Sequence, residues 1–451
     1  MAEITATFEN TIETLLAAKR FNSLRDILTT MNPSDLAVLF ENLPKDKIAL
    51  IFRLLPKGLA ADTFVEMDND LQEMLIRGFS DIELREIIDE FYLDDAVDLV
   101  EEMPANVVKR ILSQAAPETR AMINEMLKYP EDSAGSIMTT EFVSLSPDMT
   151  VTDAIKNIRQ TGIDKETIDT CFVMDSGRHL IGTITIRTLI LADEQIKVGD
   201  LMDKNLISAT TTEDQESVAQ MFAKYNFMTM PVVDSEGRLV GIVTVDDVID
   251  VIQDEATEDM EIMAAITPSD KPYLKTSVFE IWKSRIPWLL ILMISATFTG
   301  SIITHFEDAL ASYVVLTAFI PMLMDTGGNS GSQASVTVIR GISLNELNFS
   351  DIFRVVWKEF RVALLVAVTL AACNFVKLLI IDRVSIVIAA VVCITLAFTV
   401  LVAKIVGAIL PMLAKKIGFD PAVMASPFIT TIVDALSLLI YFSVASMLLN
   451  I

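Results

Sequence analysis

One carboxylate, Asp434, lies within the last apolar stretch of the chain. Asp420-Pro421-Ala422 precedes this stretch, and Ser426, Thr430 and Thr431 lie on the turns before Asp434. Carboxylate and hydroxyl oxygens suit a hard cation such as Mg²⁺, which keeps its water shell and is selected through outer-shell hydrogen bonds. A charge at membrane depth is expensive and usually functional, so the pattern favours an ion path. The alternative is a protonated Asp434 bonded to a neighbouring helix.

A second polar run interrupts an earlier apolar stretch. It reads Pro321-Met322-Leu323-Met324-Asp325-Thr326-Gly327-Gly328-Asn329-Ser330-Gly331-Ser332-Gln333. Small residues allow close helix packing, but packing alone does not account for Asp325, Asn329 and Gln333 in the same turns. Irregular or polar segments at membrane depth are tolerated where they are buried in protein or face a cavity. The run therefore favours the lining of a pore or of a helix interface.

A third group of candidate ligands is an acidic run without Lys or Arg. It consists of Asp246, Asp247, Asp250, Asp254, Glu255, Glu258, Asp259 and Glu261. The pattern is helical, and like charges four residues apart, such as Asp250 and Asp254, destabilise an isolated helix. Counter-cations would remove that penalty, so the run indicates a cation sensor. The alternative is a solvated linker helix.

Reactive side chains of other kinds are scarce. Cys171, Cys373 and Cys393 have neither disulfide nor metal-site spacing. We find no nucleophile–base pair, phosphate loop or metal-ligand triad, so the sequence does not predict an enzyme.

Charge and hydrophobicity are distributed unevenly along the chain. It carries 61 acidic and 35 basic residues, a formal net charge of −26, although 52% of its residues are hydrophobic. Acidic residues crowd residues 1–270 and apolar residues crowd 286–451, which indicates an acidic soluble region fused to a membrane domain. An acidic soluble region argues for cations and against nucleic acid as partners.

Five apolar stretches are long enough to cross the lipid bilayer, near 286–306, 311–340, 362–381, 385–413 and 424–449. Lys and Arg gather before the first stretch, between the second and third, and between the fourth and fifth. The positive-inside rule then places residues 1–285 in the cytosol and the C-terminus outside the cytoplasmic (inner) membrane.

The soluble region has two patterns. Residues 1–130 carry apolar positions at helical spacing in short, similar segments, which predicts an all-α superhelical array. Residues 136–252 contain an internal repeat, in which Asp175-Ser176-Gly177-Arg178 and Asp234-Ser235-Glu236-Gly237-Arg238 each join two predicted strands. Both copies resemble CBS domains, α/β regulatory modules that often bind adenosyl ligands.

The whole chain resembles the MgtE family of magnesium channels. The resemblance is carried by the joint Tyr129-Pro130-Glu131-Asp132-Ser133-Ala134-Gly135, the stretch Gly327–Gln333, and Asp420-Pro421-Ala422 leading through Ser426-Pro427 to Asp434. It implies a helical N-domain over 1–130, tandem CBS domains over 131–252 (about 136–200 and 201–252), a connecting plug helix over 253–280, and an all-α, five-helix transmembrane pore domain over 281–451.

The resemblance further implies a homodimer in the lipid membrane, with the pore on the two-fold axis and lined by the second and fifth spans. Asp434 matches the family's selectivity carboxylate, and Asn329 matches a second polar position. Ser332 and Ser426 stand where the family has asparagines, and they keep oxygen ligands there. The expected pore and selectivity residues are Asp434, Asn329, Gly328, Ser332, Ser426, Thr430 and Asp325.

Family Mg²⁺ sensor sites lie between the plug helix, the CBS pair, the N-domain and the cytosolic end of the pore. The positions implied here are Asp94, Asp95, Asp98, Asp214, Glu216, Asp247, Asp250, Glu255, Glu258, Asp259 and Asp420, with Asn226 where the family can have Asp. Some members bind ATP at the CBS pair. Arg187 and Phe227 match positions there, whereas Thr188 replaces an expected ribose-contacting Asp.

The resulting hypothesis is a Mg²⁺-selective channel or transporter for Mg²⁺ uptake. Its facing carboxylates repel when Mg²⁺ is scarce, and bridging Mg²⁺ ions favour the compact, closed state. One alternative is a secondary transporter coupled to protons or Na⁺, with Asp434 as proton carrier. Another is a membrane-anchored nucleotide sensor without transport, against which the polar, glycine-rich second span argues.

Overall fold

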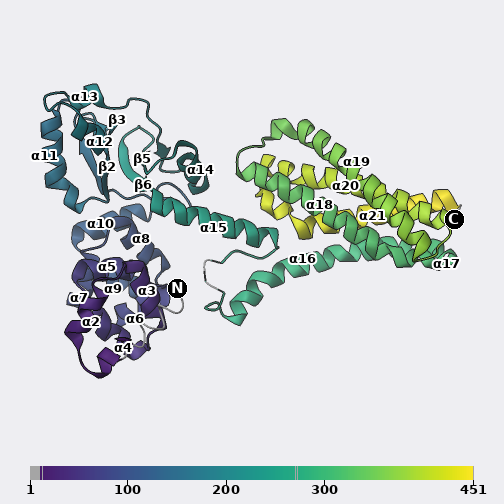
Figure 1. Cartoon of the computed structure of the whole chain (residues 1–451), viewed down its shortest axis with the longest axis horizontal. Helices are drawn as coiled ribbons and strands as arrows, with labels where there is room; N and C mark the ends of the chain where they lie inside the picture. The colour runs from purple at the N-terminus through teal and green to yellow at the C-terminus, as the bar shows by residue number, and fades with distance from the viewer. Residues whose placement is uncertain (1–10, 13, 270, 272, 450–451) are drawn as a thin grey trace. The chain divides into compact units, whose positions relative to one another are not determined.

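The computed structural model describes residues 11–449 apart from residues 13, 270 and 272, and the side chains at 164, 308, 309 and 426 lie outside this description. The chain forms two compact units, Met1–Val251 and Ile252–Ile451. Figure 1 traces the first unit from purple to teal and the second from teal through green to yellow.

Short helices build the N-terminal part of the first unit. They are α2 (Phe21–Leu28), α3 (Pro33–Asn42), α4 (Lys45–Phe52), α5 (Lys57–Val65), α6 (Asn69–Gly78), α7 (Asp81–Ile88), α8 (Leu93–Glu102), α9 (Ala105–Gln114) and α10 (Pro117–Met126). Pro33 and Pro117 occupy first turns, where the missing N–H is not needed. Helix α3 packs against α5, α5 against α7, and α7 against α9. This confirms the predicted stacked array of helices.

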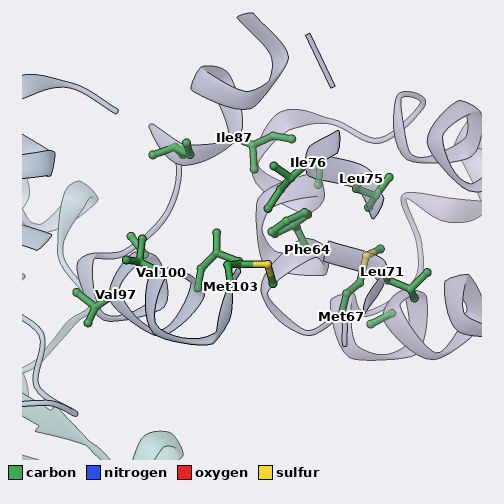
Figure 2. Close-up of a cluster of buried hydrophobic side chains, with 14 of the residues drawn as sticks. Phe64, Met67, Leu71, Leu75, Ile76, Ile87, Val97, Val100 and Met103 are labelled. Atoms are coloured by element: carbon green, nitrogen blue, oxygen red, sulfur yellow. The ribbon is translucent and has the colours of Figure 1, made fainter. Parts of the chain in front are cut away.

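A continuous apolar core joins these helices. Each helix is too short to be stable alone, so its buried face supplies most of its stability. Phe64 of α5 lies near Met103, which follows α8, among the buried side chains of α6 and α7 (Figure 2). The same core continues to Met138 and Met230 in the following domains.

The CBS repeat forms two three-stranded sheets with the same topology. In the first, β1 (Phe142–Leu145) pairs parallel to β2 (Thr167–Met174), and β2 pairs antiparallel to β3 (Leu180–Thr185). In the second, β4 (Ala209–Thr210), β5 (Thr229–Val233) and β6 (Leu239–Thr244) repeat that order. The helices of the pair are α11 (Val151–Thr161), α12 (Ile186–Leu191), α13 (Val198–Leu201) and α14 (Gln215–Tyr225).

Each CBS copy is completed by the N-terminal segment of the other copy. Thr139 exchanges two backbone hydrogen bonds of 2.8 Å with Ile242 of β6, and Asp203 pairs in the same way with Thr183 of β3. The glycines of the repeat allow this exchange: a Cβ on Gly182 would lie 2.5 Å from the sulfur of Met202. Since Met138 lies against Gly241 in the same manner, the two copies interlock.

Helix α15 (Val245–Met263) contains the whole acidic run and begins directly after β6. The second unit then contains α16 (Val278–His305), α17 (Glu307–Ser312), the 3-10 helix η2 (Val314–Phe319), α18 (Ile320–Ser343), η3 (Phe349–Asp351), α19 (Ile352–Ile380), α20 (Ile386–Lys416), η4 (Pro421–Met424) and α21 (Ser426–Leu449). Figure 1 shows α18 to α21 as a bundle of long helices, in which α20 packs against α18, α19 and α21.

Four segments in the described part of the chain are helical, long and apolar enough to cross a membrane: Val278–His305, Phe349–Ile380, Ile386–Lys416 and Pro421–Leu449. The expected span near 311–340 is instead η2 followed by α18. With 24 residues α18 has the length to cross the membrane, but its polar run makes it the least apolar of the five. The polar run of α18 is tolerated because its small residues pack against α20 and α21 and not against lipid.

Candidate functional site

Residues from α18 and α21 border one groove in the second unit. The groove has a volume of about 470 Å³ and is lined by Ile320, Pro321, Met324, Asp325, Gly328, Asn329, Thr430 and Asp434. Asp325 and Asn329 lie one turn apart on the exposed side of α18, and Asp434 is half-buried on α21. Five of the predicted pore residues (Asp325, Gly328, Asn329, Thr430 and Asp434) therefore meet in one place.

Glycines of α18 allow this helix to approach α20 and α21 closely beside the groove. A Cβ on Gly328 would lie 2.8 Å from Cγ2 of Thr430, and one on Gly327 would lie 2.7 Å from Cγ2 of Thr399. The small residues of the run thus form a packing face toward α20 and α21, while Asp325, Asn329 and Gln333 remain exposed. One run therefore combines a packing face of small residues with polar side chains, of which Asp325 and Asn329 border the groove.

The carboxylates of the groove have free oxygens. Among the residues that the structure describes, Asp325 and Asp434 make no hydrogen bond and no ion pair with another side chain. The hydroxyl of Thr430 donates to the carbonyl oxygen of Pro427 at 2.9 Å. Ser332 is half-buried outside the groove lining, and Ser426 begins α21 with a side chain outside the described set.

The end of α15 packs against the end of α18 and η4. Ile262 and Met263 of α15 contact an apolar cluster formed by Ile339, Ala422 and Ala425. Because Ile339 belongs to α18, Ala422 to η4, and Ala425 to the link between η4 and α21, this contact joins the acidic helix to α18 and to the segment that leads into α21.

Two predicted sensor residues lie close to this contact. The hydroxyl of Ser343 donates to Asp259 at 3.4 Å, and burial followed by the charge of Asp420 raises the pKa of Asp259 above its ordinary value. Asp420 itself accepts the backbone N–H of Ala422 at 2.7 Å and so caps η4. A pair of acids therefore lies where α15 contacts the end of α18.

A separate acidic cluster lies within the first unit. It combines Asp94, Asp95 and Asp98 of α8, Asp247 of α15, and Glu166, which precedes β2. Asp94 is only 8% exposed, and one oxygen of Asp94 and one of Glu166 are buried without a hydrogen-bond partner among the described residues. Asp247 accepts the hydroxyl of Thr244 at 2.5 Å, which holds its carboxylate at the start of α15.

Like charges and burial act together on this cluster. Burial, followed by the charge of Asp95, raises the pKa of Asp94 to about 7, and burial, followed by Asp247, raises that of Asp95 to about 7. The pKa of Asp247 is raised to about 7 by burial and Asp94, and those of Glu166 and Asp98 to about 8 by burial and Asp94. The carboxylates are close enough to repel, and a cation would relieve that repulsion.

Glu166 is a candidate ligand that the sequence reasoning missed. It lies between β1 and β2, where Asp148, Asp153 and Asp164 also lie, and it is far from the acidic run in sequence, so nothing in its local pattern distinguishes it. The sequence offered one general signal for such a ligand: the excess of acidic over basic residues, which requires counter-ions somewhere in the soluble unit. Its position beside Asp94 is a product of tertiary packing.

The other predicted sensor residues are dispersed. Asp214 caps α14, accepting the N–H groups of Glu216 and Ser217 at 2.9 and 3.3 Å. Asp250 is exposed on α15, and Glu255 and Glu258 lie further along that helix. Within the described ranges no three His, Cys, Asp or Glu side chains are arranged to hold a bare metal ion. The acidic groups therefore form open clusters without a closed coordination cage.

The two predicted nucleotide residues lie on different CBS copies. Arg187 is exposed on α12. Phe227 is half-buried after α14, with its ring edge-on to Phe222 at 6.2 Å, and it follows Asn226, which adopts a left-handed conformation at φ 55°. The hydroxyl of Thr188 forms a hydrogen bond of 2.9 Å with the hydroxyl of Thr185.

Comparison with protein families matches nearly all of these regions. Residues 320–444 match MgtE, described as a divalent cation transporter, and residues 31–132 match the MgtE intracellular N domain. Residues 134–194 and 198–254 match CBS domains. The fold and the matches together define a membrane protein of the divalent cation transporter class, with an intracellular helical domain and a CBS pair.

Full-length relatives define the family. The chain is 37% identical over 436 residues to the magnesium transporter MgtE of Thermus thermophilus, and 33% identical over 438 residues to that of Bacillus subtilis. These alignments cover 95% and 96% of this chain and 95% of each relative. The chain belongs to the MgtE family of magnesium transporters, which confirms the resemblance read from its motifs.

Solved structures agree for the cytosolic region. A crystal structure of the cytosolic domain of the Mg²⁺ channel MgtE in complex with ATP matches with a TM-score of 0.52 and 36% identity, over 54% of this chain and 99% of that one. The soluble part of a magnesium transporter matches with a TM-score of 0.53 and 31% identity, over 56% and 99%. The predicted helical N-domain and CBS pair are thereby confirmed.

Proposed function

We propose that this chain carries Mg²⁺ across the cytoplasmic membrane through a pathway lined by α18 and α21. The observation that supports this is the groove in which Asp434 meets Asp325 and Asn329. Mg²⁺ loses its water shell reluctantly, so a passage lined by carboxylate, amide and hydroxyl groups holds it through its bound waters. The free oxygens of Asp325 and Asp434 are suited to that contact.

The pathway is completed by a second copy of the chain. Asp325, Asn329 and Gln333 lie on the side of α18 that its own chain leaves exposed. Two copies related by a two-fold axis would bring two such faces together and enclose the ion between paired Asp434 carboxylates. Exposed polar side chains on a membrane helix would otherwise face lipid, at high cost. The apolar outer helices, such as α16, then contact lipid.

Uptake by proteoliposomes tests the pathway. Purified protein is reconstituted, and Mg²⁺ entry is followed with a trapped fluorescent indicator for wild type, Asp434→Ala and Asp434→Asn. We expect both variants to lose at least about tenfold of the uptake rate, because the carboxylate would be absent from the ion path. Glu307→Gln removes an exposed carboxylate outside the groove and serves as the matched control. Wild-type rates in both Asp434 variants would remove Asp434 from the pathway.

The same reconstitution separates a channel from a coupled transporter. Mg²⁺ current at symmetric pH and in the absence of Na⁺ is expected of a channel. Flux that requires a proton or Na⁺ gradient would instead assign Asp434 the role of a proton carrier in a secondary transporter.

The acidic cytosolic clusters are proposed to sense Mg²⁺ and close the pathway. Two like charges about 4 Å apart repel by about 4 kcal/mol at an effective dielectric of 20. The cluster around Asp94 and Asp247, and the pair Asp259 and Asp420, therefore disfavour the compact arrangement when Mg²⁺ is scarce. Bridging hydrated Mg²⁺ binds that arrangement more tightly and shifts the population toward it. The open form of the clusters suits an ion that keeps its waters.

Limited proteolysis tests this sensing. Full-length protein is digested with and without millimolar Mg²⁺, and cleavage between the N-domain and the CBS pair is followed by gel. We expect Mg²⁺ to slow cleavage several-fold in wild type and to have little effect in an Asp94→Asn, Asp247→Asn double variant. Equal cleavage of wild type in both conditions would contradict the sensing role.

We further propose that the CBS pair binds an adenine nucleotide beside Arg187 and Phe227. The support is the similarity to a cytosolic domain that was solved with ATP. Arg187 would pair with phosphate and Phe227 would contact the base, while Thr188 offers a hydroxyl to the ribose where an acid is expected. Calorimetry with ATP on wild type and Arg187→Ala measures this, and an absence of heat in wild type would rule it out.

A further inference from the structure

Tyr441 makes a long-range contact that the ion pathway described so far does not use. Its side chain is completely buried, and its hydroxyl donates a hydrogen bond of 2.9 Å to the carbonyl oxygen of Leu316. Tyr441 belongs to α21 and Leu316 to η2, 125 residues away in sequence. A buried phenol requires a partner for its O–H, so this contact fixes one helix to one backbone position.

The segment held in this way leads directly into the groove. Helix η2 ends at Phe319, and the next two residues, Ile320 and Pro321, border the groove. A 3-10 helix has poorer hydrogen-bond geometry than an α-helix, so its position depends on outside contacts. Leu316 and Phe319 pack in one apolar core with Leu438, Tyr441 and Phe442 of α21. The start of α18 is therefore set by its contact with α21.

Tyr441 also lies on the same face of α21 as Asp434. The two residues are seven positions apart, which is about two helical turns. Ser437 lies between them, and it lies against Gly327 of α18: a Cβ on that glycine would lie 2.8 Å from the serine Oγ. One face of α21 thus carries the groove carboxylate, the contact with the glycine face, and the hydrogen bond to η2.

We propose that Tyr441 is a positioning residue that sets the width of the ion pathway by holding η2 in place. The inference rests on the proposed function of the groove. Hydrated Mg²⁺ and Ca²⁺ differ in size and in how rigidly they hold water, so discrimination depends on the separation of the oxygen-bearing walls. Tyr441 fixes that separation from outside the groove, and it touches no ion.

Tyr441→Phe tests the role of the hydroxyl while keeping the ring that fills the core. The full-length variant is reconstituted, and the uptake of Mg²⁺ and of Ca²⁺ is measured in parallel vesicles. We expect the ratio of Mg²⁺ to Ca²⁺ uptake to fall about 5- to 10-fold, the change that corresponds to the loss of one hydrogen bond. Ser443→Ala is the matched control, because that hydroxyl is exposed and donates to the carbonyl oxygen of Leu439 in its own helix. Its ratio should equal that of wild type.

The melting temperature of each variant in detergent distinguishes positioning from simple stabilisation. A lower melting temperature with an unchanged uptake ratio would overturn the inference, because the hydroxyl would then serve folding alone. An unchanged ratio with an unchanged melting temperature would overturn it as well. Failure of the proposed function has a different signature, since wild-type vesicles would then take up no Mg²⁺.

Discussion

Gly407 of α20 lies directly against Gly331 of α18, and a Cβ on Gly407 would lie 2.2 Å from the carbonyl oxygen of Gly331. The obstructing atom belongs to the backbone, so it cannot rotate aside as a side chain can. Gly331 also lies against α21, where a Cβ would meet Ile429 at 2.7 Å. The crossing of α18 and α20 therefore holds the polar face of α18 in place beside Asp434.

Gly407→Ala is expected to separate α18 from α20 and to lower Mg²⁺ uptake about tenfold or more. Overpacking of this kind costs roughly 1–3 kcal/mol when neighbours can shift, and here the neighbour is backbone. Uptake and the yield of folded protein are measured together. Gly300→Ala is the control, since a Cβ at that position of α16 would meet, among the described residues, no heavy atom within 4 Å beyond its chain neighbours and its own helix backbone. Equal uptake in both variants would show that the crossing tolerates separation.

The ion pair between the buried Lys404 and the half-buried Glu359 is expected to stabilise the bundle only as a pair. Lys404 is 4% exposed on α20, with its nitrogen 3.9 Å from the carboxylate of Glu359 on α19. Lys404→Met leaves the half-buried carboxylate of Glu359 unpaired, which should cost roughly 1–3 kcal/mol. The double variant Lys404→Met, Glu359→Met should recover most of that loss. Melting temperatures in detergent check this, and additive losses would contradict the pairing.

The compact state of the cytosolic region should become less stable as pH rises when Mg²⁺ is absent. The pKa values of Asp94, Asp95 and Asp247 are raised to about 7 and that of Glu166 to about 8, whereas unfolded carboxyls titrate near 4. The folded state therefore binds more protons between about pH 4 and 8, and the free energy of unfolding falls across that window.

Thermal unfolding of the full-length protein at pH 5.5 and pH 8, with and without Mg²⁺, measures this effect. We expect Mg²⁺ to raise the melting temperature more at pH 8, where protons no longer compete for the carboxylates. Asp94→Asn should reduce the dependence on pH, and Asp148→Asn, at an exposed acid outside the cluster, should not. Melting temperatures that do not vary with pH would contradict the cluster's charge coupling.

Ile262→Asp should weaken the contact between α15 and the end of α18. Ile262 packs with Met263 against Ile339, Ala422 and Ala425, and a carboxylate there would be desolvated beside Asp259. Under the proposed gating, the uptake rate of this variant at high internal Mg²⁺ should be several-fold higher than that of wild type. Met260→Asp provides the control because Met260 is 67% exposed on the same helix. Full inhibition of both variants by Mg²⁺ would argue that this apolar contact does not hold the closed state.

The polar residues of the candidate pathway could be predicted from local sequence patterns. Asp434 in an apolar stretch, and Asp325 with Asn329 one turn apart, stand out because membrane depth penalises polar groups. The interlocking of the CBS copies was not predicted, although the repeat itself was. Gly182 and Gly241 are matched to Met202 and Met138 of the opposite copy, and the match becomes visible only when the strands pair.

Residue types and their periodicity were sufficient to predict the class of protein, the order of its domains and the oxygen-rich lining of the candidate groove, because those follow from hydrophobic patterning and ligand chemistry. The location of Glu166 beside Asp94, and the hydrogen bond from Tyr441 to Leu316, depend on packing between elements that are distant along the chain. Such contacts arise when separate apolar faces are buried together, and local sequence patterns do not record which faces will meet.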